Sequence, residues 1–305
     1  MGAQCPLATL RRMNLSQAVN AFLDYKLYFR RVRPQSIKTY SAHLNRFSAA
    51  VGPSTPLNGA INRAEPFLIE MSRRGRSDAY VRKAFFVVRN FAAWSCAKGY
   101  ARSNPLHDAK APMLHDRQKV FLTRAQVASL LTAIRRSGQI HRKRDHALVS
   151  TLYYALFRIS EALNARPEDF DLTSCNVRVF GKGGKARMIP FHPNLVPILR
   201  GWLRERPKDS PLLFPSGGSA GNRAPGQLGQ SRVGLVLRTI YGPAAGLGKK
   251  VSPHVLRRSG ADHLYNKGAD LGQLKGLLRH NSVNTTMTYL QVETPANLRG
   301  AWKKL

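Results

Sequence analysis

The sequence predicts a mostly α-helical protein with a small antiparallel sheet, divided into two domains. The chain has 305 residues, 43% of them hydrophobic, which favours two ordinary cores over one. Apolar residues recur at helical spacing through residues 14–102 and again after residue 121. Within the second region, two short alternating apolar stretches flank a glycine-rich turn, which is the pattern of a hairpin.

The first predicted domain, residues 14–102, is a small basic bundle of helices. We expect residues 1–13, which show no periodicity, to form a flexible lead-in. A first helix should begin at Asn14 or Ser16 and a second at Pro34, with further helices over residues 63–73 and 77–98. Residues 52–59 are rich in Pro, Ser and Thr and are predicted to be a loop.

A proline-containing stretch without periodicity, residues 103–120, is the predicted interdomain linker. The second domain then covers residues 121–292, followed by a tail of residues 293–305. Thr123 is a candidate N-cap, and residues 145–163 should be a strongly apolar helix interrupted by Arg158. Strands are expected over residues 177–180 and 188–190, and helices over residues 195–206 and 231–241.

The charge of the chain indicates a polyanionic partner. Lys and Arg number 49 against 16 Asp and Glu, a net charge of +33. The sequence has no run of eighteen apolar residues and no signal peptide pattern, so nucleic acid is favoured over a membrane surface as the partner. We therefore expect the protein in the cytoplasm, at the nucleoid. The residues proposed to contact DNA are basic positions on the predicted helices and hairpin: Lys38, Arg46, Arg82, Lys83, Arg89, Lys185 and Arg187.

Cysteine and metal-binding patterns are lacking. Cys5, Cys96 and Cys175 are odd in number and without C-x-x-C spacing, which indicates neither a disulfide framework nor a zinc site. Neither an H-E-x-x-H motif nor an EF-hand loop occurs in the sequence. We therefore expect chemistry without a metal or another cofactor.

The C-terminal part of the second domain, residues 251–290, holds the strongest candidate for an active site. His254 and Arg257 stand three apart after Pro253, at a helix start, so both should project from one face and grip a small anion. His280 and then Tyr289 follow. A phenol titrates near ~10, so it needs a base or a strong positive field to attack a phosphodiester. The alternative is a DNA-contacting face on which Tyr289 is a core aromatic.

Arg158 adds a second cation. An arginine at the end of a buried helix is costly without an anionic partner. That partner could be a substrate phosphate or Glu161, three residues later, and the two interpretations are compatible because a carboxylate can orient a guanidinium.

These motifs resemble those of the tyrosine recombinase (phage integrase) family. The second signature box of that family matches H-x-L-R at 254–257, L-x-R-H ending at His280, and a tyrosine nine residues later. The stretch ALFRISEAL resembles the first box, with Phe157 where glycine usually precedes the arginine. Arg258 stands where the family often has a second histidine, and Arg279 where it has glycine. The segment GKGGKAR resembles the hairpin that delivers a catalytic lysine, matched by Lys182 with Lys185 as the competitor.

The resemblance implies a fold and a reaction. It implies an N-terminal helical core-binding domain and a mixed α+β catalytic domain that form a C-shaped clamp on DNA. It implies site-specific recombination, as integration, excision or resolution, through a 3′-phosphotyrosine, in a compact Xer-like or mobile-element enzyme. The implied catalytic residues are Arg158, Lys182, His254, Arg257, His280 and Tyr289, with Glu161 in an orienting role.

The resemblance also implies partners. We expect double-stranded DNA with paired recognition sites, a dimer on one site and a tetramer in synapsis, with the tail docked on a neighbouring protomer. Two alternatives remain open: a type IB-like DNA topoisomerase and a catalytically silent DNA-binding protein.

Overall fold

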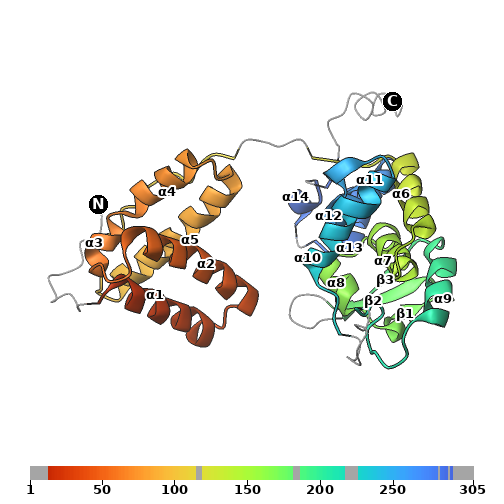
Figure 1. Ribbon diagram of the computed structural model, residues 1–305, viewed down its shortest axis with the longest axis horizontal. Coiled ribbons are helices and arrows are strands. Elements are labelled where there is room, and N and C mark those ends of the chain that lie inside the picture. Colours follow the sequence, from red (N-terminus) through yellow and green to blue (C-terminus); the bar gives the residue numbers. More distant parts are fainter. Residues whose placement is uncertain are drawn as a thin grey trace. The chain divides into compact units, whose positions relative to one another are not determined.

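The computed structural model describes residues 13–114, 119–180, 186–216, 226–280, 282–287 and 289–290 (Figure 1). The chain divides into two compact units, Met1–Gln118 and Lys119–Leu305. The described residues are mostly helical, with one three-stranded antiparallel sheet in the second unit, so the predicted fold class is confirmed. Among the described helices, none is long and apolar enough to cross a membrane.

The named secondary-structure elements in the described part of the N-terminal unit are all helices. Phe22, Phe47 and Phe91 are fully buried at its centre because they fall on the apolar faces of three helices. Asn14 closes a capping box with Gln17 and so fixes the start of the first helix. The elements are α1 (Leu15–Asp24), the π-helical η1 (Tyr25–Phe29), α2 (Pro34–Val51), α3 (Leu57–Ile61), α4 (Ala64–Arg73) and α5 (Asp78–Ala97).

Two details of this unit differ from the sequence expectation. The stretch 52–59, predicted as a loop, contains the start of α3, because Leu57, Ala60 and Ile61 are buried in the core and stabilise a short helix that has weak local signals. Leu106, in the proposed linker of residues 103–120, is also buried in this core, so that stretch begins on the N-terminal unit.

The C-terminal unit is built around α7 (Arg142–Tyr154), whose side chains are buried over most of its length. Helices α6, α9 and α12 pack against it. Thr123 and Gln126 form the capping box of α6, at the predicted position. The other helices are α6 (Arg124–Arg136), α8 (Ile159–Asn164), η2 (Pro167–Asp169), α9 (Leu195–Glu205), α10 (Gln230–Val236), η3 (Leu237–Tyr241), α11 (Gly242–Ala244), η4 (Gly248–Lys250), α12 (Pro253–Tyr265), α13 (Leu271–Leu278) and α14 (Val283–Met287).

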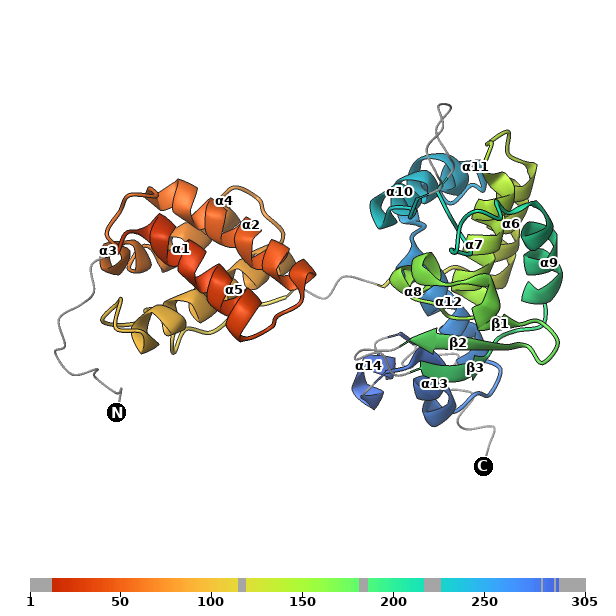
Figure 2. The same cartoon turned by 90° about the horizontal axis from the view of Figure 1, so that it is seen from below.

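The sheet has the order β1-β2-β3, with β1 at Phe170–Asp171, β2 at Asn176–Phe180 and β3 at Ala186–Pro190 (Figure 2). Val177 pairs with Ile189, and both are buried on the face that packs on the core. The two predicted strands are therefore present and paired antiparallel. The sequence pattern predicts no strand at β1, because two residues are too few to show alternation and their pairing with β2 is a tertiary effect.

Candidate functional site

The break between α7 and α8 positions Arg158. Leu156, after the last turn of α7, has a positive φ of 50°, which turns its carbonyl toward α12 and α13. Arg158 then takes an extended conformation as the N-cap of α8. Its Nη1 donates to Glu161 Oε1 at 2.8 Å, and its backbone N–H donates to Glu161 Oε2 at 2.7 Å. The contact expected between Arg158 and Glu161 is thus formed, and the guanidinium stays about one-third exposed.

Helix α12 carries Arg257 into the interior. Ser252 caps this helix, and Pro253 occupies its first turn. Gly260 permits close approach to the end of α7, since a Cβ there would lie 2.7 Å from both Leu156 Cδ2 and the Tyr153 carbonyl. The Arg257 side chain is fully buried. It donates to the carbonyl of Leu156 and, at 2.5 Å, to that of Leu278.

Helix α13 adds a guanidinium that the sequence pattern had marked only as a departure. Asp270 caps α13, and the helix ends at Leu278, followed by its C-cap Arg279, which has a left-handed φ of 55°. A side chain in that conformation costs roughly 1–2 kcal/mol. Arg279 Nη2 donates to the Leu156 carbonyl at 2.9 Å and to Glu161 Oε2 at 2.5 Å. The isolated sequence gives no signal for this contact, because it depends on a turn more than 120 positions earlier.

Three guanidiniums therefore surround one carboxylate. Glu161 Oε2 also lies 3.4 Å from Arg257 Nη1, so Arg158, Arg257 and Arg279 share a single negative charge and leave a net charge of about +2. Burial raises the pKa of Glu161, but Arg279, the Arg158 backbone N–H and Arg257 outweigh it, and the pKa falls below its ordinary value. Glu161 is thus ionised at neutral pH.

The cluster has unused hydrogen-bond donors. Arg257 Nε and Arg279 Nε and Nη1 are buried without a partner among the described residues. Burial, then Arg279 and Arg158, lowers the pKa of Arg257, yet a guanidinium keeps its proton in proteins. Excess positive charge and unpaired N–H groups are the features of a site that binds an oxyanion.

His280 and Tyr289 lie together beside this cluster. Their ring centroids are 4.9 Å apart in an edge-to-face arrangement. His280 is buried, with Nδ1 at 3.1 Å from Thr286 Oγ1. Burial first, and then Arg257, lowers the pKa of His280 to about 4, so the imidazole is neutral at pH 7.

Tyr289 is partly buried and packs against the cluster of Leu274, Leu278 and Leu290. The guanidinium carbon of Arg257 lies 5.7 Å from its ring centre, and that of Arg258 lies 5.9 Å away. Packing therefore holds the ring next to two guanidiniums at cation–π distance.

His254 differs from the expectation that it and Arg257 would project together. His254 is exposed, whereas Arg257 is buried, because the three-residue step on α12 carries Arg257 under the end of α13. The pKa of His254 is lowered by partial desolvation and then by Arg257, Arg258 and Arg158. Its imidazole is thus a neutral proton acceptor at pH 7.

Of the three basic residues predicted to act from the hairpin, the structure describes Arg187. Lys182 and Lys185 lie outside the described residues. Arg187 is exposed on β3, opposite Val179.

The basic candidates of the N-terminal unit fall into two groups. Lys38, Arg46 and Lys83 are exposed on α2 and α5. Arg82 and Arg89 are half-buried: Arg82 Nη1 donates to the Pro112 carbonyl at 2.6 Å, and Arg89 lies over the Phe85 ring. The first group is exposed to solvent, although the guanidinium of Arg46 lies over the Tyr80 ring, whereas Arg82 is bonded to the segment that follows α5.

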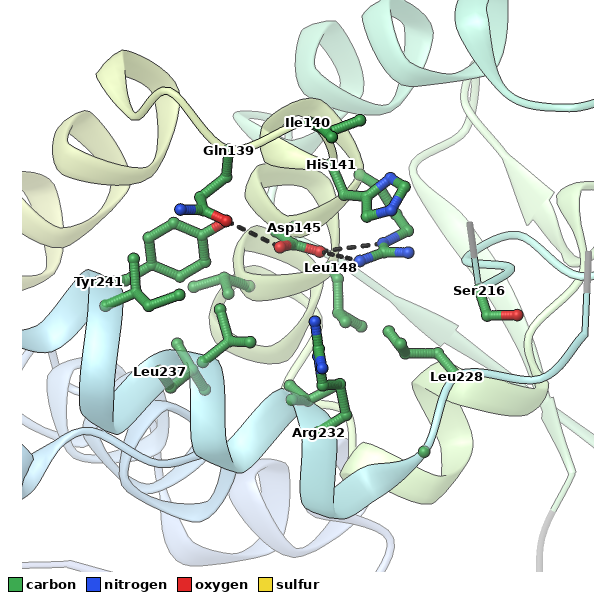
Figure 3. A pocket seen from close by; sticks show the side chains of 16 residues that line it. Gln139, Ile140, His141, Asp145, Leu148, Ser216, Leu228, Arg232, Leu237 and Tyr241 are labelled. Atoms are coloured by element: carbon green, nitrogen blue, oxygen red, sulfur yellow. Dashed lines mark hydrogen bonds and ion pairs between the residues drawn. The ribbon is translucent and has the colours of Figure 1, made fainter. Parts of the chain in front are cut away.

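A separate pocket of about 460 Å³ lies between the start of α7 and the helices α10 and η3 (Figure 3). Asp145 at its wall accepts two hydrogen bonds from Arg144 and one from the hydroxyl of Tyr241. The remaining lining is largely aliphatic, including Leu148, Leu228 and Leu237. No group of three or more His, Cys, Asp or Glu side chains that could hold a metal ion occurs within the described ranges of either unit.

Comparison with known proteins decides the family. The model described as "Phage integrase family" matches residues 120–295, more than half of the chain. The chain belongs to the phage integrase family. The tyrosine recombinase XerD of Caulobacter vibrioides is 31% identical over 236 residues, covering 75% of each chain. The tyrosine recombinase XerC of Alcanivorax borkumensis is 29% identical over 285 residues, covering 92% of this chain and 91% of the relative.

Solved structures of recombinases share the fold. A XerH site-specific recombinase bound to a palindromic difH substrate superimposes with a TM-score of 0.74 at 21% identity, covering 98% of both chains. A Tn1549 transposon integrase in complex with circular intermediate DNA gives a TM-score of 0.73 at 18% identity, covering 96% of this chain and 100% of the other. The protein is therefore a tyrosine recombinase, an enzyme of site-specific DNA recombination, as the sequence motifs predicted.

Proposed function

We propose that this phage integrase family member cleaves and rejoins DNA strands through a 3′-phosphotyrosine on Tyr289. The observation that carries the proposal is the packing of Tyr289 beside His280 and a buried cluster of net charge about +2. Such a cluster is complementary to the pentacoordinate phosphorane, which carries more negative charge than the ground-state diester.

Arg158 and Arg257 would hold the non-bridging oxygens. Arg158 is the most accessible guanidinium of the cluster. Arg257 has five N–H groups, and its contacts with Leu156, Leu278 and Glu161 occupy only three of them. Arginine suits this task because its planar donor fork matches a phosphate.

The two histidines would take different parts. His254, exposed and neutral, accepts the phenol proton as Tyr289 attacks. His280 donates from Nε2 to a phosphate oxygen when the Thr286 hydroxyl donates to its Nδ1, a pairing that fits their 3.1 Å separation.

Lys182 would protonate the leaving 5′-oxygen, an assignment that rests on the resemblance alone. The phosphotyrosine conserves the energy of the phosphodiester. A free 5′-hydroxyl can therefore attack it without ATP, and attack by a different strand gives recombination.

The first test is Tyr289→Phe. This variant should bind DNA as the parent does yet form no denaturation-resistant protein-DNA adduct, because only the nucleophilic oxygen is removed. Sequencing the DNA crosslinked to Tyr289 in the parent identifies the target site. An adduct formed by Tyr289→Phe would refute the assignment of the nucleophile.

The same experiment separates the alternative functions. Relaxation of supercoiled plasmid without strand exchange would support a type IB-like topoisomerase, and absence of any adduct in the parent would support a silent DNA-binding protein.

We also propose that the recombinase acts as a homo-oligomer on double-stranded DNA with paired sites, a dimer on each site and a tetramer in synapsis, in the cytoplasm at the nucleoid. The N-terminal unit would be the core-binding domain and the C-terminal unit the catalytic domain of a clamp. Residues 293–305 would dock on a neighbouring protomer.

Truncation after Val292 tests this docking. It should weaken synapsis of two sites more than binding of one site, measured by native gel shift, because only the contact between protomers is lost. Equal loss of both would place the tail within its own protomer.

A further inference from the structure

Arg279 has two properties that rarely occur together. Its backbone is in the left-handed region, with a φ of 55°, and its side chain is 94% buried. A left-handed backbone conformation is unfavourable for residues other than glycine, and burial is unfavourable for a charged guanidinium. A residue that carries both costs needs a compensating role in the native state.

The contacts of Arg279 are shared with the proposed phosphate-binding arginines. Its Nη2 donates to the Leu156 carbonyl, the same oxygen that accepts from Arg257. The same Nη2 donates to Glu161 Oε2, the oxygen that also accepts the backbone N–H of Arg158. Arg279 is thus bonded to both acceptors that orient Arg158 and Arg257.

A second observation concerns Phe157. This residue is almost fully buried, and the guanidinium carbon of Arg279 lies 5.3 Å from its ring centre. An aromatic face supports a cation at this distance without consuming any of its N–H groups. Phe157 and Arg279 therefore contact each other beside Glu161.

We propose that Arg279 is a positioning residue of the strand-cleavage site, held by Phe157, that fixes Glu161 and the Leu156 carbonyl and thereby orients Arg158 and Arg257. The inference rests on the proposed role of those two arginines. The unpaired Nε and Nη1 of Arg279 add positive potential behind the phosphate position.

The test uses Arg279→Gly, with Arg31→Gly as the matched control. Arg31 also has a left-handed backbone, with a φ of 48°, but it is exposed in the N-terminal unit. Both substitutions relieve the same type of backbone strain, and only the first removes a guanidinium from Glu161.

The first measurement needs no DNA. The pKa of the Glu161 carboxyl is followed by ¹³C NMR in the full chain, with Glu161→Gln to assign its signal. Loss of Arg279 should raise that pKa by about 1, because an adjacent cation favours the carboxylate. Arg31→Gly should leave it unchanged. An unchanged pKa in Arg279→Gly would overturn the proposal, whether or not the parent cleaves DNA.

The second measurement is the rate of single-turnover cleavage at saturating protein, on a nicked duplex that carries the site recovered from the Tyr289 adduct. Arg279→Gly should slow cleavage roughly ten- to a hundredfold with unchanged DNA affinity, because the phosphate-binding groups are misplaced rather than removed. Arg279→Lys should restore part of the rate.

A double-mutant cycle with Glu161→Gln identifies the route. If Arg279 acts through Glu161, the double variant should cleave no more slowly than the slower single variant. Multiplicative losses, or a parent rate in Arg279→Gly, would overturn the positioning role. If the parent forms no adduct with any DNA, the proposed function fails, whereas the pKa measurement still decides the link between Arg279 and Glu161.

Discussion

Two largely buried carboxylates in the C-terminal unit have different surroundings. Asp145 accepts two hydrogen bonds from Arg144 and one from Tyr241 (Figure 3). The third nitrogen of Arg144 donates to the Pro215 carbonyl. One cation meets one anion, and each of the three guanidinium nitrogens of Arg144 has a partner. Glu161 instead faces three guanidiniums, and buried N–H groups around it have no partner in the part of the chain that the structure describes.

The difference lies in charge balance. A balanced pair such as Arg144–Asp145 anchors helix α7 and needs nothing more. An unbalanced cluster costs folding free energy unless an anion completes it, so it indicates a binding site for a negatively charged substrate. Both carboxylates are largely buried beside arginine, but Asp145 is paired with one guanidinium and Glu161 with three.

The largest expected effect on the cleavage rate comes from a substitution that keeps the positive charge but removes the planar guanidinium donors. Arg257→Lys should slow single-turnover cleavage roughly a hundredfold or more, because lysine cannot replace the planar donor set at the phosphorane. Arg144→Lys should leave cleavage at saturating protein near the parent rate and lower the free energy of unfolding by about 1–3 kcal/mol through its lost hydrogen bonds. Urea unfolding and suicide-substrate cleavage measure the two quantities.

The opposite pattern would break the comparison. If Arg144→Lys slows cleavage and Arg257→Lys lowers only the free energy of unfolding, an excess of arginines around a carboxylate does not identify the catalytic site.

A further large effect concerns Lys182, which lies outside the described residues. Lys182→Ala should slow cleavage of a normal phosphodiester by about a hundredfold or more, a typical general-acid contribution. On a 5′-bridging phosphorothiolate it should recover most of the parent rate, because a thiol with a pKa near ~8.5 leaves without protonation. Arg257→Ala should not recover on this substrate.

Lys185→Ala is the matched control for that experiment. Rescue of Lys185→Ala in place of Lys182→Ala would assign the acid to Lys185. Rescue of neither variant would remove lysine from the mechanism.

The smallest effect is on the pH dependence of stability. The pKa of His280 is about 4 in the folded protein and near ~6.5 in the unfolded chain. Between these pH values His280 is protonated in the unfolded chain and neutral in the folded protein. The contribution of neutral His280 to the free energy of unfolding is therefore fully present above pH 6.5 and is lost as the pH falls toward 4. The loss is at most about 3 kcal/mol.

His280→Gln should therefore flatten the fall in unfolding free energy between pH 6.5 and 4, measured by urea unfolding at each pH. His146→Gln is the control at a histidine outside the site, also with a lowered pKa. An unchanged slope in His280→Gln would mean that the cluster does not hold His280 neutral.

The sequence by itself determined the helical periodicities, the hairpin, the excess of basic residues and the spacing of Arg158, His254, Arg257, His280 and Tyr289. Local signals sufficed for these features, since capping residues and apolar spacing act within a few positions. Strand β1 and helix α3 were missed because their stability comes from pairing and burial against distant segments.

Only the tertiary structure decided how the charges are shared. Arg279 looked like a departure from a motif, and Phe157 looked like another. Their contact, and the sharing of Glu161 by three arginines, arise because the left-handed turns at Leu156 and Arg279 bring the ends of α7 and α13 together. Coulomb forces depend on distance in space, and that distance is set by the packing of α12 on α7 at Gly260 rather than by separation along the chain.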